Sequence, residues 1–168
     1  VIVLNDGSSY ALGYNSVGQL GIGSLGFCNQ FTKVLLSVSL DLVVCGSTFT
    51  VWRSSSNNEI YVAGSTYGSK PQRLTCGTAN SQSIKAISMS AYKQTFGLID
   101  DSGVIKLWPH FLDDEKSIDN FVCCLLPSSP TQISCGDGFA SALSNGVAYR
   151  ISNDGSFVSF VTIDHHSW

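Results

Sequence analysis

The sequence predicts an all-β protein built from repeated units of four short strands, which is the organisation of a β-propeller. Charged residues make up only 12% of the chain, and Glu occurs only at Glu59 and Glu115. A helical protein of this length carries many more charged side chains on its solvent-facing surfaces. Similar segments recur about every 45 residues, and turn-favouring pairs separate their apolar runs. Together these observations favour short strands over helices.

The first repeated element is a small pair, a two-residue turn and a β-prone run. It occupies residues 45–53, 90–98 and 135–143. Each copy follows a short apolar stretch, so each predicts two strands joined by a tight turn. Aligned without gaps, Ala91 takes the place of Gly46 and Gly136.

The second repeated element is a hairpin turn followed by another strand. Its turns are Asp-Gly at 6–7, Asn-Asn at 57–58, Ser-Gly at 102–103 and Asn-Gly at 145–146. All four pairs tolerate the positive φ angles that tight hairpins require. The predicted units, or blades, are residues 1–39, 40–83, 84–130 and 131–168, which together form one domain.

The opening of the chain carries a more specific pattern. Its elements are Asp6-Gly7, Tyr10-Ala11-Leu12-Gly13, Asn15, Gly18-Gln19-Leu20-Gly21 and Gly23. This pattern resembles the signature of the regulator-of-chromosome-condensation repeat family, and the pairs Cys45-Gly46 and Cys135-Gly136 fall where that family has a small buried pair. The resemblance implies a β-propeller of seven blades, of which this chain would form roughly half. It does not carry functional residues over, because the position that is often His in the family is Phe49, Gln94 and Phe139 here.

The two ends of the predicted half ring are expected to leave sheet edges open. The chain begins within a blade, at a strand over residues 1–4, and its last predicted strand covers 157–163. A first residue other than Met suggests a processed product or a fragment. The missing blades would belong to the rest of a longer polypeptide, or to another chain or a second copy; failing both, the chain closes in some other way. Unpaired edges recruit other strands, so we expect pairing with another polypeptide.

A glycine-rich stretch from Gly21 to Gly26 matches the dinucleotide-binding pattern G-x-G-x-x-G. That site requires a strand directly before the glycines and a helix directly after them. Here a turn precedes the pattern, and residues 27–32 have little helix propensity. The repeat explains the glycines, so we predict no cofactor.

The cysteines and histidines predict no metal site, because metal ligation needs several such ligands at close spacing. Cys45 and Cys135 hold equivalent repeat positions and are expected to pack as small buried residues. The pair Cys123-Cys124 lies in an apolar run and is interpreted as part of a core strand, and His165-His166 as a solvated tail. The six cysteines are expected to be free thiols in a reducing compartment, cytoplasmic or nuclear.

Nothing in the sequence predicts an enzyme. A hydrolase would need a nucleophile, a base and an orienting acid, and no strand-turn-helix elbow carries a candidate serine. Asp100-Asp101 precedes a turn, where an acidic side chain favours local backbone hydrogen bonds. With a net charge of −3 and scattered basic residues, the chain also shows no binding surface for nucleic acid or for a membrane.

The densest charge cluster contains Asp113, Asp114 and Glu115, and it is read either as a solvated loop or as an acidic protrusion that meets a basic partner. Trp52 and Trp108 fall on predicted strands and are expected in the core. The leading functional hypothesis is a non-catalytic protein-interaction module or regulatory scaffold. The resemblance also implies an alternative, guanine-nucleotide exchange on a small GTPase such as Ran. A third class is a structural component of a large assembly.

Overall fold

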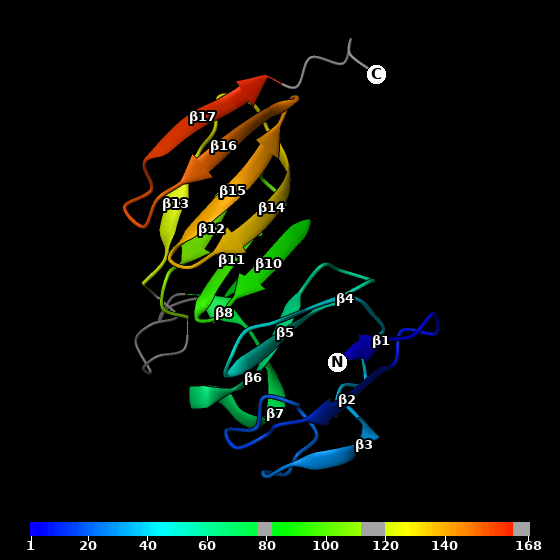
Figure 1. The fold of residues 1–168 in the computed structure, drawn as a ribbon. Helices are drawn as coiled ribbons and strands as arrows, with labels where there is room; N and C mark the ends of the chain where they lie inside the picture. The colour runs from blue at the N-terminus through cyan, green and yellow to red at the C-terminus, as the bar shows by residue number, and fades with distance from the viewer. Residues whose placement is uncertain (77–81, 112–119, 163–168) are drawn as a thin grey trace, which may run out of the picture.

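Four antiparallel β-sheets follow one another along the chain in the computed structural model, which describes residues 1–76, 82–111 and 120–162 (Figure 1). Each sheet packs its face against the next, with an apolar cluster between neighbours. The predicted all-β propeller architecture is therefore confirmed. In the described part of the chain the only helix is a single 3₁₀ turn, η1 (Ser65–Tyr67).

The sheets are numbered here as blades 1 to 4. Blade 1 contains β1 (Ile2–Val3), β2 (Ser9–Gly13) and β3 (Cys28–Lys33). Blade 2 contains β4 (Leu40–Cys45), β5 (Phe49–Ser54), β6 (Ile60–Gly64) and β7 (Gly68–Arg73). Blade 3 contains β10 (Ser88–Tyr92), β11 (Thr95–Ile99), β12 (Ile105–Trp108) and β13 (Val122–Cys124). Blade 4 contains β14 (Pro130–Gly136), β15 (Phe139–Ser144), β16 (Val147–Ile151) and β17 (Phe157–Thr162), and a small hairpin of β8 (Thr75–Cys76) and β9 (Gln82–Ser83) links blades 2 and 3.

The strand register confirms the repeat but corrects the third unit by one residue. Cys45 pairs with Thr50, Ala91 with Phe96 and Cys135 with Ala140, so Ala91 is equivalent to the two cysteines. The gap-free alignment, which matched Ala91 to Gly46 and Gly136, is wrong at this point. Because hairpin register follows the position of the turn, one residue added before the turn shifts the whole strand pair.

Turn chemistry at the second repeated element is as predicted. Gly7, Asn58, Gly103 and Asn145 all have positive φ, at 80°, 59°, 82° and 49°. In blade 3 the Asp100 carboxylate also accepts hydrogen bonds from the backbone N–H groups of Ser102 and Val104. The acidic residue therefore stabilises the turn through local bonds, as the sequence indicates.

Aromatic side chains dominate the core between blades 2 and 3. Phe49, Phe96, Trp108 and Phe111 are fully buried, and the ring centroids of Phe49 and Phe111 lie 4.9 Å apart in an edge-to-face arrangement. Trp52 is also fully buried and packs between blades 1 and 2. Both tryptophans predicted to lie in the core are confirmed there.

The glycine-rich stretch after β2 packs against the next blade and leads into β3, with no helix after it. A Cβ on Gly18 would lie 2.5 Å from the Ser69 Cα, and the Gly23 N–H donates to the Ser69 carbonyl at 2.8 Å. Close approach of two backbones therefore requires the glycine at position 18. Within the described residues, no helix is both long enough and apolar enough to cross a membrane.

Cysteine burial differs from the prediction at two positions. Cys45 is exposed, whereas Cys135 is largely covered by blade 3. In the described chain blade 1 has three strands, and none of them covers Cys45 as β10 covers Cys135. Cys124 is buried but its neighbour Cys123 is exposed, because successive side chains of β13 point to opposite faces.

Candidate interaction face

The hairpins that join the first two strands of blades 2, 3 and 4 lie side by side at one end of the sheets. Their turns are residues 47–48, 93–94 and 137–138, which we call the hairpin face. Hydrogen bonds link each turn to the next: Ser47 N–H donates to the Lys93 carbonyl at 2.8 Å, and Gly138 N–H donates to Thr95 Oγ1 at 2.9 Å. The backbone of the face is thus held by the fold itself.

Polar side chains continue this linkage across the surface. Thr48 Oγ1 donates to Gln94 Oε1 at 3.0 Å, and Lys93 Nζ lies 2.6 Å from Asp137 Oδ2. The hydrogen bond and charge of Asp137 raise the pKa of Lys93 above its ordinary value. Both ionised side chains are more than half exposed, so the pair contributes little to stability and remains accessible to a partner.

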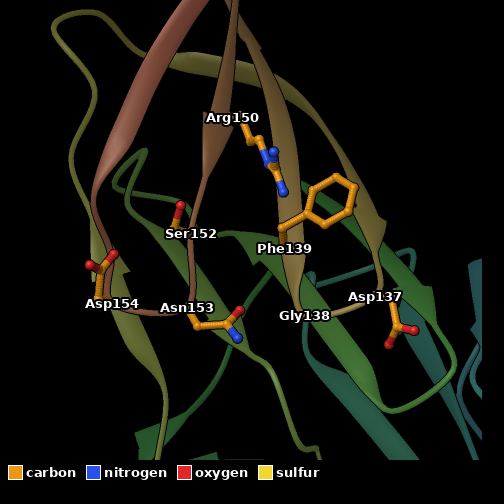
Figure 2. A pocket seen from close by; sticks show the side chains of 7 residues that line it. All are labelled: Asp137, Gly138, Phe139, Arg150, Ser152, Asn153 and Asp154. Atoms are coloured by element: carbon orange, nitrogen blue, oxygen red, sulfur yellow. The ribbon is translucent and has the colours of Figure 1, made fainter.

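A hollow of about 380 Å³ opens where the hairpin face meets the β16–β17 turn of blade 4 (Figure 2). Its lining includes Phe139 at the start of β15, Arg150 near the end of β16, and Asn153 and Asp154 in the turn after β16. A hydrophobic ring, a guanidinium, an amide and a carboxylate therefore converge on one site. Such a mixture suits recognition of a polar protein segment.

Arg150 and Phe139 contact each other in the lining of this hollow. The guanidinium carbon of Arg150 lies 4.4 Å from the centroid of the Phe139 ring, so the cation covers the ring face. Asp154 on the other side of the hollow accepts hydrogen bonds from the Ser156 N–H and hydroxyl, at 2.9 and 2.5 Å. These hydrogen bonds, the hydroxyl bond first, hold the pKa of Asp154 below its ordinary value.

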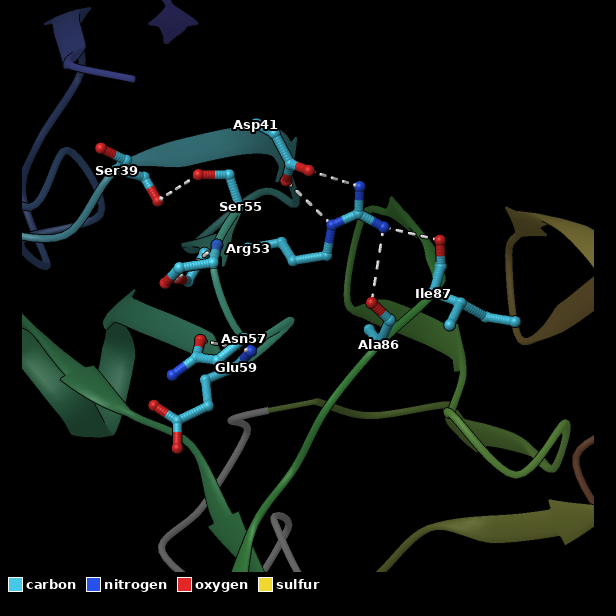
Figure 3. Close-up of polar contacts among 10 residues, drawn as sticks. Ser39, Asp41, Arg53, Ser55, Asn57, Glu59, Ala86 and Ile87 are labelled. Atoms are coloured by element: carbon cyan, nitrogen blue, oxygen red, sulfur yellow. Dashed lines mark hydrogen bonds and ion pairs between the residues drawn. The ribbon is translucent and has the colours of Figure 1, made fainter. Parts of the chain in front are cut away.

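At the opposite end of the blades, a polar cluster centred on Arg53 has a structural role (Figure 3). Its guanidinium donates to both carboxylate oxygens of Asp41 at 2.9 Å, and to the carbonyls of Ile87 at 2.6 Å and Ala86 at 3.4 Å. Asp41 lies on β4, whereas Ala86 and Ile87 lead into β10, so this side chain joins blades 2 and 3. All these groups are partnered within the fold, which leaves little to bind a ligand.

The residues predicted as sites divide between those the structure places and those it does not. Asp113, Asp114 and Glu115 lie outside the described residues, as do His165 and His166. No disulfide is formed by Cys28, Cys45, Cys123, Cys124 or Cys135. No three His, Cys, Asp or Glu side chains in the described ranges gather as metal ligands would.

Known structures share this fold. Human WBSCR16 superposes with a TM-score of 0.70 at 16% identity, over 89% of this chain and 44% of WBSCR16. A structure of Prp20 from Saccharomyces cerevisiae gives 0.67 at 13% identity, over 90% of this chain and 42% of Prp20. A second structure of this yeast RCC1 gives 0.63 at 14% identity, over 85% of this chain and 40% of Prp20. The fold is that of a regulator-of-chromosome-condensation β-propeller. This chain spans less than half the length of the protein chains in these structures. No protein-family profile and no curated protein matches its sequence.

The sequence analysis did not predict this hollow, although the sequence places an arginine, Arg150, at a repeat position that is apolar in blade 2. The repeat aligns residues 145–151 with 57–63, and this alignment puts Arg150 in the place of Val62. The observed register agrees, since Val62 pairs with Val51 and Arg150 with Ser141. An arginine at a core position of a repeat was thus visible in the sequence. Its ring partner Phe139 could be identified only from the register of the sheet.

Proposed function

We propose that this propeller is a non-catalytic protein-interaction module that binds its partner through the hairpin face. The observation that carries the proposal is the row of turns at 47–48, 93–94 and 137–138, fixed by bonds between blades and ending at the Arg150–Phe139 hollow. Binding residues are often located on loops that a rigid scaffold positions. Here the scaffold is the stacked sheets, and the exposed Lys93–Asp137 pair offers both charges to a partner.

Structures of the same fold support a protein partner. Prp20 has been crystallised with Kap60 bound, and another study of it describes binding to Gsp1p and to histones. Those partners belong to Prp20; for this chain they favour only the general class, a protein ligand. We also propose that the acidic segment of Asp113, Asp114 and Glu115 contributes to the interaction surface.

A charge exchange on the hairpin face tests the proposal. Lys93→Glu combined with Asp137→Lys retains an ion pair but exchanges the two charges, so the fold should remain while a charge-complementary partner is lost. Partners captured by the wild-type chain are purified and titrated against both proteins by calorimetry. We expect the affinity for the partner to fall about tenfold or more, because close charge pairs across an interface contribute at least that much to binding.

The matched control for the charge-exchanged protein is Asp101→Asn, which removes an exposed charge at the opposite end of the blades. This variant should bind the partner with wild-type affinity. If the charge-exchanged protein also binds with wild-type affinity, the hairpin face is not the interface and the proposal fails.

Guanine-nucleotide exchange is the second candidate, and the binding of Prp20 to Gsp1p favours it. An exchange factor needs a broad face shaped to its GTPase, with a standard interface of about 800 Å² per partner. In the described chain the hairpin face consists of three hairpins, which is a narrow surface for such an interface. We expect no acceleration of labelled-GDP release from Ran at micromolar concentrations of this 168-residue chain. Release by substoichiometric amounts would place exchange ahead of the scaffold function.

A further inference from the structure

We propose that a hollow beside Leu35, on the outer rim of the propeller, binds a protein segment in which an apolar side chain lies between two carboxylates. The hollow has a volume of about 350 Å³ and is lined by residues 33–37, which end β3 and lead toward β4. We call it the rim hollow. It forms no part of the hairpin face, so the inference goes beyond the proposed function.

Leu35 is held rigidly at the joint between blades 1 and 2. Its N–H donates to the Gly21 carbonyl at 2.9 Å, and a Cβ on Gly23 would lie 2.6 Å from Leu35 Cδ1. Gly23 in turn donates its N–H to the Ser69 carbonyl of blade 2 at 2.8 Å. Leu35 is nevertheless 52% exposed. An apolar side chain that is fixed before binding loses little conformational freedom when a partner covers it.

The exposure of this rim position does not depend on a neighbouring blade. Lys33, Arg73 and Cys123 are equivalent, since each pairs with the second residue of the strand before it. Leu35 and Leu125 each lie two residues further along the chain. Leu125 is 69% exposed although blade 3 has a described blade on either side. Arg73 and Cys123 are also exposed, with a preceding blade in place. The outer rim is therefore open to solvent within the stacked blades.

Two lysine side chains flank the exposed leucine. Lys33 lies two residues before Leu35, at the end of β3. Lys70 lies on β7, and its Cε would be 4.0 Å from a Cβ on Gly23, the same atom that Leu35 would meet. Both lysines are exposed, and neither forms an ion pair with a carboxylate of the described residues. The rim hollow therefore combines an apolar surface with two available positive charges.

The acidic side chains of this part of the rim are already engaged. Asp6, on which Lys33 exerts a weak electrostatic effect, accepts hydrogen bonds from the Ser8 N–H and hydroxyl at 2.9 and 2.6 Å. Glu59 of blade 2 pairs with Arg73 at 3.3 Å. Neither carboxylate neutralises the two lysines at the rim hollow. The complementary charges are those of carboxylates on a partner.

The apolar part of the rim hollow specifies the class of partner. A nucleic acid would bind exposed lysines through its phosphates, and such binding gains nothing from a leucine. Burying Leu35 against an apolar side chain removes both from water, which is the main source of affinity for a short segment. A peptide that carries an apolar residue between two acidic residues satisfies the leucine and both lysines together.

The test titrates the whole chain with three acetylated peptide amides, Ser-Asp-Leu-Asp-Ser, Ser-Asn-Leu-Asn-Ser and Ser-Asp-Ser-Asp-Ser. Binding is followed by NMR, through the Leu35 methyl groups and the backbone amides of residues 33–37. We expect a saturable shift with the first peptide. The Asn peptide should bind about threefold more weakly, because exposed ion pairs are individually weak. The peptide without leucine should bind about tenfold more weakly, because it buries no large apolar side chain. Equal binding of all three peptides would overturn the inference, as would tighter binding of a short DNA oligonucleotide to the same residues.

Variants of the leucine give the second arm of the test. Leu35→Ser should weaken the Asp-Leu-Asp peptide about tenfold, and because the side chain is half exposed the fold should persist, as urea unfolding would show. Leu125→Ser is the matched control, since it changes the equivalent exposed leucine of blade 3. It should leave peptide binding unchanged. Retained binding in Leu35→Ser, or an equal loss in Leu125→Ser, would show that the rim hollow is not the site.

Variants of the lysines test the charge requirement. Lys33→Gln combined with Lys70→Gln should weaken the Asp-Leu-Asp peptide about threefold, to the level of the Asn-Leu-Asn peptide on the wild-type chain. Lys85→Gln is the control, because Lys85 is exposed but does not line the rim hollow. If the double variant still distinguishes the two peptides as the wild type does, the lysines do not receive the carboxylates and the proposal fails.

The outcomes for the rim hollow and for the hairpin face are independent. The charge exchange at Lys93 and Asp137 should leave binding of the Asp-Leu-Asp peptide unchanged, and a loss of that binding would contradict a separate rim site. If Leu35→Ser has no effect while the charge exchange weakens partner binding, the rim hollow is wrong and the hairpin face stands. The reverse result retains the rim hollow and rejects the hairpin face.

Discussion

The Sγ atom of Cys135 lies 3.2 Å from the carbonyl oxygen of Ser90, across the boundary between blades 3 and 4. The Cys135 N–H also donates to Ser90 Oγ at 3.0 Å. A Cβ on Gly97 would lie 2.9 Å from the same sulfur, so only a glycine fits beside it. The thiol is therefore a packing element of the propeller, and its equivalent in blade 2, Cys45, has no such cover.

This contrast predicts different reactivity for the two thiols. Burial raises the pKa of Cys135 to about 12, against an ordinary value of 9.0. Because the thiolate is the nucleophile and Cys135 is also largely covered, Cys135 at pH 8 should be alkylated at least about tenfold more slowly than the exposed Cys45. Iodoacetamide labelling of the native protein, followed by peptide mass spectrometry, measures both rates. Labelling of Cys135 as fast as Cys45 would contradict the packing described.

Arg53 should stabilise the joint between blades 2 and 3. Arg53→Leu removes a two-point ion pair with Asp41 and the bonds to the Ala86 and Ile87 carbonyls. We expect the free energy of unfolding to fall by about 1–3 kcal/mol, the range for bonds that involve a charged group. Urea unfolding followed by tryptophan fluorescence measures the change. The control is Arg73→Leu, where a half-exposed ion pair is lost and the change should stay below about 1 kcal/mol. Equal losses in the two variants would refute the role of Arg53.

Asp100 predicts a dependence of stability on acid pH. Burial alone would raise the pKa of this carboxyl, but hydrogen bonds from Ser102, Lys106 and Val104 outweigh it and hold the pKa below the ordinary 3.8. Because the pKa is lower in the folded state than in the unfolded state, the ionised Asp100 carboxylate stabilises the fold above pH 3.8. This stabilisation is lost as the pH falls through the lower, folded-state pKa. Asp100→Asn should therefore reduce stability at pH 7 and flatten its decline below pH 4.

The measurement is urea unfolding of both proteins from pH 7 to pH 2.5. Asp154→Asn provides the comparison, since Asp154 has similar turn bonds but is fully exposed, and its effect should be smaller. A parallel decline in Asp100→Asn and wild type would show that this carboxyl does not contribute.

The open side of blade 1 should cause self-association of the isolated 168-residue chain. Ile2 and Leu12 are each 40% exposed and point to the same side of the sheet, since Ile2 pairs with Tyr10 and Leu12 follows two residues later. Exposed apolar sheet surfaces with a free edge recruit further strands. Light scattering should show a mass that rises with concentration, and Leu12→Ser should reduce the rise. A monomer at all concentrations would contradict this expectation.

Local sequence was sufficient for the type and order of the elements. The turn pairs at 6–7, 57–58, 102–103 and 145–146 require positive φ, and the alternation of apolar residues around them predicts strands. The repeat then predicts blades, because identical units that cannot bury a face alone stack on one another. The buried positions of Trp52 and Trp108 follow from the same alternation.

Only the tertiary structure decided the register, the burial of individual side chains and the candidate site. Ala91 is equivalent to Cys45 and Cys135, one position away from its match in the gap-free alignment. The β10–β11 turn sets this pairing, and pairing depends on the partner strand. Cys45 and Cys135 hold equivalent repeat positions, yet the neighbouring blade covers only Cys135. Arg150 and Phe139 meet because adjacent strands bring together residues eleven positions apart in the chain. Each of these properties depends on contact between separate segments, which short-range sequence patterns do not encode.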